Sequence, residues 1–176
     1  QTYWIADERP YTMNEIVDTI ELVLERDFSV EVAHRRLRLP YLAGQAAQAV
    51  ETAILGGKKI YVYGCGATGR LAKQMESAFW RPFWGRVKAD GKIWRQLAGR
   101  IPSATAIEES LIGEMTGADR ALISSLEGFE DLPQIGRLQL HDRGIGKGDV
   151  VICVTEGGET SSVIGTILAA LDQWKG

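Results

Sequence analysis

The chain has 176 residues, of which 45% are hydrophobic and 24% charged, as in a single globular domain with a substantial core. Its formal net charge is −3 and no apolar run nears the roughly 20 residues that cross a bilayer, which argues against nucleic-acid and membrane partners. Two separated cysteines and two histidines form neither a disulfide framework nor a metal-ligand cluster, so we expect a cytoplasmic protein without metal or cofactor.

Residues 1–57 are predicted to form a helical segment that precedes the main domain. Capping residues near Tyr11, followed by apolar side chains on one helical face, predict a first helix. Ser29 is expected to cap a second helix that ends at Pro40, because proline interrupts helical hydrogen bonding. A third helix is expected over 41–55, since the glycine pair that follows is typical of a helix C-terminus.

Two short apolar runs, 59–63 and 150–154, predict strands that are each followed by a glycine-rich loop. Helices are expected after these loops, over 68–79 and 160–174. In a parallel α/β sheet, such loops present backbone N–H groups and helix N-termini to an anion at the carboxyl edge. Two of them in one domain predict a site for a phosphorylated or otherwise anionic small molecule.

Between these strands, residues 79–103 interleave aromatic and basic side chains. This pattern fits either single-stranded nucleic acid bound by stacking or a surface insertion whose aromatics pack on the domain or on a partner subunit. The acidic overall charge favours the insertion. Residues 108–113 are compatible with a short strand or a short helix, and 119–129 with a helix.

Three blocks in order, 64–72, 116–131 and 148–160, resemble sugar isomerase (SIS) domains. They are most similar to the branch that holds N-acetylmuramic acid 6-phosphate etherase and the glucokinase regulatory protein. The resemblance implies a three-layer α/β fold over 58–176, in which helices flank a parallel sheet of typically five strands and an insertion occupies about 85–109. Because the sequence ends one helix after the second clear strand, we expect a domain that is truncated on its C-terminal side, or unusually short, or completed by another subunit. An open strand edge then predicts a homodimer.

The resemblance also implies a sugar-phosphate ligand held between the two loops. Glycines let the backbone approach the phosphate, and the helix dipoles favour its negative charge. Glu156 would repel the phosphate unless its side chain points away. The alternative is that the glycines only make tight strand-to-helix turns. The candidate contacts are Gly66, Ala67, Thr68, Gly69 and Arg70 in the first loop, and Thr155, Glu156, Gly157, Gly158, Thr160 and Ser161 in the second.

In the resembling etherases, one glutamate removes the proton at C2 of the sugar and another protonates the departing lactyl ether oxygen. The resemblance places Glu127 at the base, where the alternative is an ordinary solvated carboxylate. Counting without gaps, the acid falls on Ala78, and the candidate acid is Glu76, two residues earlier. Two residues turn a helix by about 200°, so Glu76 faces the same cavity only if the helix shifts locally near the aromatic insertion. The sequence therefore favours a sugar-phosphate-binding domain. It leaves open an etherase-type carbon–oxygen lyase, a non-catalytic sugar-phosphate sensor like the regulatory protein, and a structural fragment that binds nothing.

Overall fold

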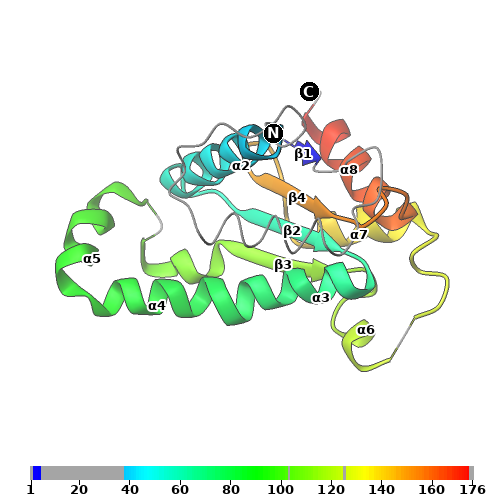
Figure 1. The fold of residues 1–176 in the computed structure, drawn as a ribbon, viewed down its shortest axis with the longest axis horizontal. Coiled ribbons are helices and arrows are strands. Elements are labelled where there is room, and N and C mark those ends of the chain that lie inside the picture. Colours follow the sequence, from blue (N-terminus) through cyan, green and yellow to red (C-terminus); the bar gives the residue numbers. More distant parts are fainter. Residues whose placement is uncertain (1, 5–37, 103, 125, 175–176) are drawn as a thin grey trace.

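The computed structural model describes residues 2–4, 38–102, 104–124 and 126–174, and within them four parallel strands form one sheet. The strands are β1 (Thr2–Trp4), β2 (Ile60–Gly64), β3 (Leu111–Met115) and β4 (Val150–Val154), in the spatial order β1-β4-β2-β3 (Figure 1). Ile60 is in register with both Leu111 and Val150, so β2, β3 and β4 end together at one carboxyl edge. The first helix expected from the sequence lies outside the described residues, as does most of the second.

Alternating side chains of the strands build a core on each face of the sheet. Ile60 and Val62 face a cluster that includes Ala53 of α2 (Arg38–Leu55) and Ala72 of α3 (Gly66–Gln74). The opposite face packs on α7 (Pro133–Asp142) and α8 (Ser161–Trp174) through Tyr61, Tyr63, Leu140, Val151, Cys153, Val163, Ala169 and Ala170. The predicted α/β architecture, a parallel sheet between two helical layers, is confirmed.

The helix that follows the first loop is longer than the sequence predicts. Helix α3 continues without a break into the π-helix η1 (Met75–Trp80) and α4 (Arg81–Ala89), the long lower helix of Figure 1. Three short helices follow: α5 (Gly91–Leu97), η2 (Ala98–Arg100) and η3 (Ala104–Glu109). Within the described residues, none of the helices combines the length and apolar character that a bilayer crossing needs.

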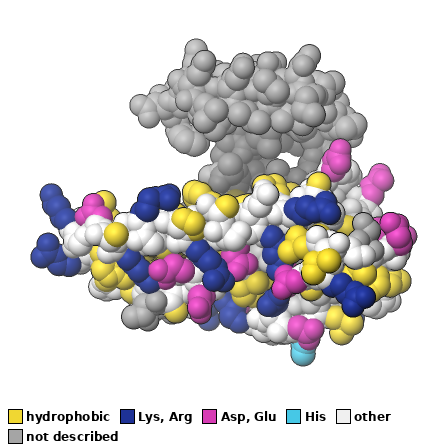
Figure 2. Space-filling view, turned by 90° about the horizontal axis from the view of Figure 1, so that it is seen from below, with side chains coloured by type: hydrophobic (Ala, Val, Ile, Leu, Met, Phe, Trp, Pro, Cys, Tyr) yellow, Lys and Arg dark blue, Asp and Glu magenta, His cyan; other side chains and the backbone are white. Residues whose placement is uncertain are grey.

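Two of the aromatic side chains expected in an insertion belong to the core. Trp80 and Trp84 are 7% and 6% exposed, and their rings meet edge to face with centroids 5.7 Å apart. The indole N–H of Trp80 donates to the Ile107 carbonyl at 3.0 Å. Phe79 and Phe83 stack on one another at the surface instead. Figure 2 shows acidic and basic side chains interspersed over one face of the molecule.

Two of the expected helix boundaries are wrong. Pro40 lies inside the first turn of α2 rather than ending a helix, because a proline there removes an N–H that has no helical acceptor. The helix expected over 119–129 is limited to α6 (Arg120–Ile123), since Ser124 is extended and Gly128 has a φ of +79°. Helix α7, which the sequence analysis did not predict, follows this loop.

A buried carboxylate joins three elements beneath the carboxyl edge. Glu114 of β3 is 1% exposed, and its oxygens contact Lys73 Nζ of α3 at 3.2 Å and Arg143 Nε, just after α7, at 2.7 Å. Lys73 also contacts Asp119 at 2.8 Å, and this ion pair lowers the pKa of Asp119. The Asp119 contribution to stability is therefore present above its unfolded-state pKa and lost as the pH falls through the lowered value.

Candidate functional site

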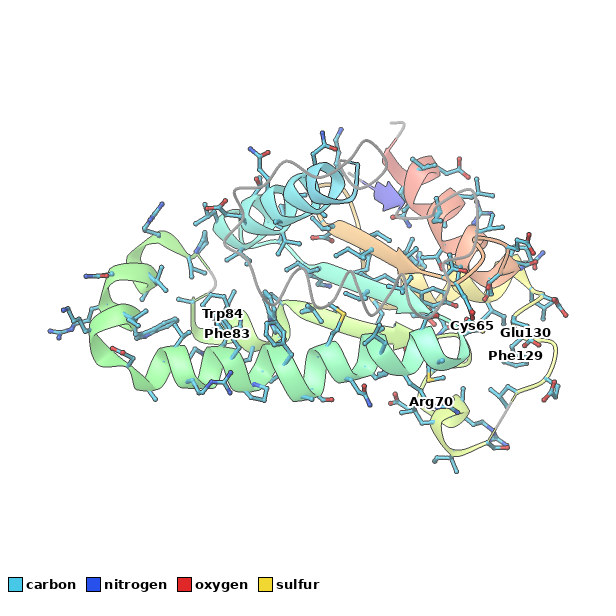
Figure 3. The ribbon with its side chains drawn as sticks, in the orientation of Figure 1. Cys65, Arg70, Phe83, Trp84, Phe129 and Glu130 are labelled. Atoms are coloured by element: carbon cyan, nitrogen blue, oxygen red, sulfur yellow. The ribbon has the colours of Figure 1, made fainter. Side chains whose placement is uncertain are left out.

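A cavity of about 610 Å³ opens at the carboxyl edge of the sheet, where the loops after β2, β3 and β4 meet. Figure 3 shows Cys65, Arg70, Phe129 and Glu130 gathered at this end of the molecule, whereas Phe83 and Trp84 lie toward the other end. The lining residues are Cys65, Gly66, Ala67, Thr68, Arg70, Met115, Thr116, Ala121, Leu126, Glu127, Phe129, Glu130, Asp131, Thr155, Glu156, Glu159, Thr160 and Ser161.

The first glycine-rich loop contributes four of its five candidate residues to the cavity wall. Gly66, Ala67, Thr68 and Arg70 line it, whereas Gly69 is buried beneath the loop. A Cβ at Gly69 would lie 2.3 Å from the Met115 Cβ, so this glycine allows α3 to pack on β3. The Thr68 hydroxyl donates to the Cys65 carbonyl at 2.9 Å and accepts from the Cys65 N–H at 3.1 Å. Its only proton is used there, so the Thr68 hydroxyl is not a donor for a ligand.

The second loop contributes residues from both of its ends. Thr155 and Glu156 directly follow β4, while Thr160 and Ser161 open α8, and all four line the cavity. Gly157 and Gly158 lie outside the lining. The hydroxyls of Thr155 and Thr160 are 3.4 Å apart, so a bond between them leaves one of the two protons for a ligand.

Glu127 lies on the cavity wall, in the segment 126–131 that leads toward α7. A backbone hydrogen bond of 2.9 Å from the Ser162 N–H to the Glu130 carbonyl ties this segment to the first turn of α8. That bond satisfies one of the amides that a helix N-terminus leaves without a helical acceptor. The cavity wall that carries Glu127 is thus attached to the second loop.

Glu76 lies outside the cavity, on η1. One of its oxygens accepts from the Gly113 N–H of β3 at 2.8 Å, and the other pairs with Arg81 at 2.7 Å. Strand β3 is at an edge of the described sheet, so Glu76 satisfies a main-chain donor that has no strand beside it. In this position its carboxylate has a structural role.

The charge of the lining is uneven. Arg70 is the one Lys or Arg among the lining residues, and it has no ion-pair partner in the part of the chain that the structure describes. Five carboxylates share the lining with it: Glu127, Glu130, Asp131, Glu156 and Glu159. Among the described residues, no group of three or more His, Cys, Asp or Glu side chains is arranged to hold a metal ion.

Several lining residues were not proposed as site residues from the sequence. They are Cys65, Met115, Thr116, Ala121, Leu126, Phe129, Glu130, Asp131 and Glu159. A signal was available for two of them, because Met115 ends β3 and Thr116 follows it, and in α/β sheets ligands bind outside the carboxyl ends of strands. Cys65 and Glu159 lie within the two glycine-rich loops, and Ala121 lies in α6. The other four depend on the path of the segment 126–131, whose irregular backbone no sequence pattern predicts.

The two cysteines provide a direct check of the cavity wall. At about pH 8 we expect iodoacetamide to alkylate Cys65 and to leave Cys153 unmodified, because alkylation needs an accessible thiolate. Cys65 lines the cavity, whereas burial raises the pKa of Cys153 to about 12. Peptide mass spectrometry would locate the adduct, and the Cys65→Ser variant should acquire none. Equal labelling of both thiols would contradict the packing of β4.

Comparison with known proteins relates the chain to N-acetylmuramic acid 6-phosphate etherases. The etherase of Lactococcus lactis subsp. lactis is 30% identical over 140 residues, which make up 80% of this chain and 38% of that protein. The etherase of Mesorhizobium japonicum is 30% identical over 149 residues, or 85% of this chain and 41% of that protein. The chain thus spans about two fifths of the length of these relatives.

A shorter similarity joins the chain to an uncharacterised protein of Sinorhizobium fredii. The two are 42% identical over 52 residues, which cover 30% of this chain and 15% of that protein. No protein-family model and no solved structure matches the chain. The relationship to the etherases therefore rests on sequence similarity that extends over most of this chain.

Proposed function

We propose that this chain, a relative of the N-acetylmuramic acid 6-phosphate etherases over most of its length, binds a sugar phosphate in the cavity at the carboxyl edge. The observation that carries the proposal is the convergence of two helix N-termini, those of α3 and α8, on one cavity that Arg70 also lines. Helix N-termini and an arginine attract a phosphate through main-chain N–H groups and positive charge.

Three of the five lining carboxylates, those of the segment 126–131, suit the sugar rather than the phosphate. A carboxylate only accepts hydrogen bonds, and sugar hydroxyls are donors that can satisfy it. Glu127, Glu130 and Asp131 lie on a segment separate from both glycine-rich loops. In the proposed complex the phosphate is therefore bound by the first turns of α3 and α8, and the hydroxyls are directed to the wall 126–131.

Arg70→Ala is expected to weaken the binding of N-acetylglucosamine 6-phosphate by about ten-fold or more, because a charge-assisted hydrogen bond is worth about 1.5–3 kcal/mol. Isothermal titration calorimetry would measure the change. Arg100→Ala is the matched control, since Arg100 belongs to η2 and lies outside the cavity lining. The proposal fails if the unmodified protein binds no amino-sugar or hexose phosphate, or if both variants bind as the unmodified protein does.

A second candidate is an etherase-type elimination in the same cavity. Glu127 would remove the C2 proton, and Glu156 or Glu159 would protonate the departing ether oxygen, since these carboxylates line the cavity and Glu76 does not. Incubation with N-acetylmuramic acid 6-phosphate should then release lactate, and Glu127→Gln should abolish the release. Glu76→Gln should retain it. Binding without release of lactate would instead indicate a non-catalytic sensor.

A further inference from the structure

A chain of buried hydrogen bonds runs directly behind the cavity wall. The Thr116 hydroxyl lies 3.0 Å from the Tyr63 hydroxyl and 2.9 Å from the Ser162 hydroxyl. The Tyr63 hydroxyl lies 3.1 Å from Gln139 Oε1. Tyr63 and Ser162 are fully buried and Thr116 is 4% exposed, so water does not replace these bonds. Buried polar groups that satisfy one another rigidify the elements that they join.

Gln139 fixes the direction of the first bond in this chain. Its Nε2 donates to the Met115 carbonyl at 2.8 Å, and its Oε1 accepts from the Gly117 N–H at 3.3 Å, which determines the orientation of the amide. Tyr63 must therefore donate to Oε1. Because each hydroxyl has one proton, Thr116 donates to Tyr63 at 3.0 Å or to the Gly64 carbonyl at 3.5 Å. In either case Ser162 donates to Thr116. Neither hydroxyl proton is left for a ligand.

Thr116 also contacts the segment that carries the first loop. Its backbone N–H donates to the carbonyl of Gly64 at 3.0 Å, and Gly64 is the last residue of β2, directly before that loop. Ser162, which donates to the Thr116 side chain, belongs to the first turn of α8 after the second loop. One residue thus holds the bases of both glycine-rich loops.

We infer that Thr116 is a positioning residue that sets the separation of the α3 and α8 N-termini, and through it the affinity for a phosphate group. This inference rests on the proposed function, because it assigns a spacing requirement to the same cavity. Thr116 acts through main-chain donors of the two loops. Loss of its hydroxyl removes the Ser162–Thr116 bond, through which Thr116 holds the first turn of α8 against the end of β2. Among the described residues, the Ser162 hydroxyl is then left with the Tyr63 hydroxyl alone.

Thr116→Val is expected to raise the dissociation constants of inorganic phosphate and N-acetylglucosamine 6-phosphate by about ten-fold, equivalent to about 1.4 kcal/mol. Thr116→Ser retains the hydroxyl and should restore the affinity. Thr166→Val is the matched control: Thr166 is as buried as Ser162 and lies one turn further along α8. Its hydroxyl donates to the Ser162 carbonyl at 3.2 Å and also contacts the Tyr63 hydroxyl, but among the described residues it bonds neither Thr116 nor Gly64. Unchanged affinity in Thr116→Val, or an equal loss in Thr166→Val, would overturn the inference.

A readout without ligand separates this inference from the proposed function. In ¹⁵N–¹H correlation spectra, Thr116→Val should shift the amide resonances of both loops, those of 65–68 and those of 160–163. Thr166→Val should shift those of α8 and of Gly136, which packs against Thr166, but not those of 65–68. If the unmodified protein binds neither phosphate probe, the proposed function fails, and the spectra still decide whether Thr116 links the loops. A perturbation confined to the neighbours of Thr116 would refute that link.

Discussion

Replacing Glu114 by alanine is expected to lower the free energy of unfolding by about 3 kcal/mol, a large fraction of the roughly 5–15 kcal/mol typical of a domain. The side chain is almost fully buried and accepts from both Lys73 and Arg143. Removing it leaves these two cations near the carboxyl edge without their shared counterion, although Lys73 retains Asp119. Urea denaturation followed by circular dichroism would measure the loss.

Glu109→Ala is the matched control for this substitution. Glu109 precedes the same strand, is exposed, and should change the stability by less than about 0.5 kcal/mol. Glu114→Gln keeps the side-chain volume and one acceptor oxygen, so its loss of stability should lie between those of Glu114→Ala and Glu109→Ala. A loss in Glu114→Ala that does not exceed the loss in Glu109→Ala would show that the buried ion pairs contribute nothing to stability.

Gly165→Ala is expected to destabilise the protein by about 3 kcal/mol, at the upper end of the usual cost of overpacking. A Cβ at this position in α8 would lie 2.0 Å from the Pro133 carbonyl oxygen and 2.6 Å from its carbon. Both atoms belong to the backbone at the start of α7, so the contact cannot be relieved by rotating a side chain. The two helices would have to separate, and the second loop would move with α8. Thermal unfolding would detect the loss as a lower Tm.

The control for Gly165 should change stability in the opposite direction. Gly85 lies inside α4, and a Cβ there would meet no atom within 4 Å. Alanine has the higher helix propensity, so Gly85→Ala should stabilise the protein by up to about 1 kcal/mol. If both substitutions changed the Tm in the same direction, the close approach of α7 and α8 would not be what requires glycine at position 165.

Strands β2 and β4 are predictable from the sequence because each is a short apolar run that ends at a glycine-rich loop. Helix α7 is not predictable in this way, since its position depends on a close approach to α8. At this approach, a Cβ at Gly136 would lie 2.0 Å from the Ser162 carbonyl oxygen. Side-chain directions along the long helix cannot be predicted from the α-helical period either, because η1 changes that period and with it the direction of each side chain.

For the cavity too, features set by local sequence are predictable and features set by long-range contacts are not. The two glycine-rich loops are found from local patterns, because each one lies at a strand-to-helix junction. The helix expected over 119–129 takes in the first part of the segment 126–131, and no local pattern shows that the Glu130 carbonyl accepts from α8. The excess of carboxylates in the cavity lining could therefore not be predicted from the sequence, since these carboxylates come from two segments that are distant in sequence.

The bond from the Ser162 N–H to the Glu130 carbonyl also bears on how a ligand meets the cavity. Loops move within nanoseconds to microseconds, and a motion of the segment 126–131 that broke this bond would give an open state beside the closed one. When the bond is open, α8 gains a free amide donor and the wall moves away from it. A ligand shifts this equilibrium only by the difference between its affinities for the two states. An anion small enough to contact α8 alone therefore favours the open state, whereas a ligand that also contacts the wall 126–131 favours the closed one.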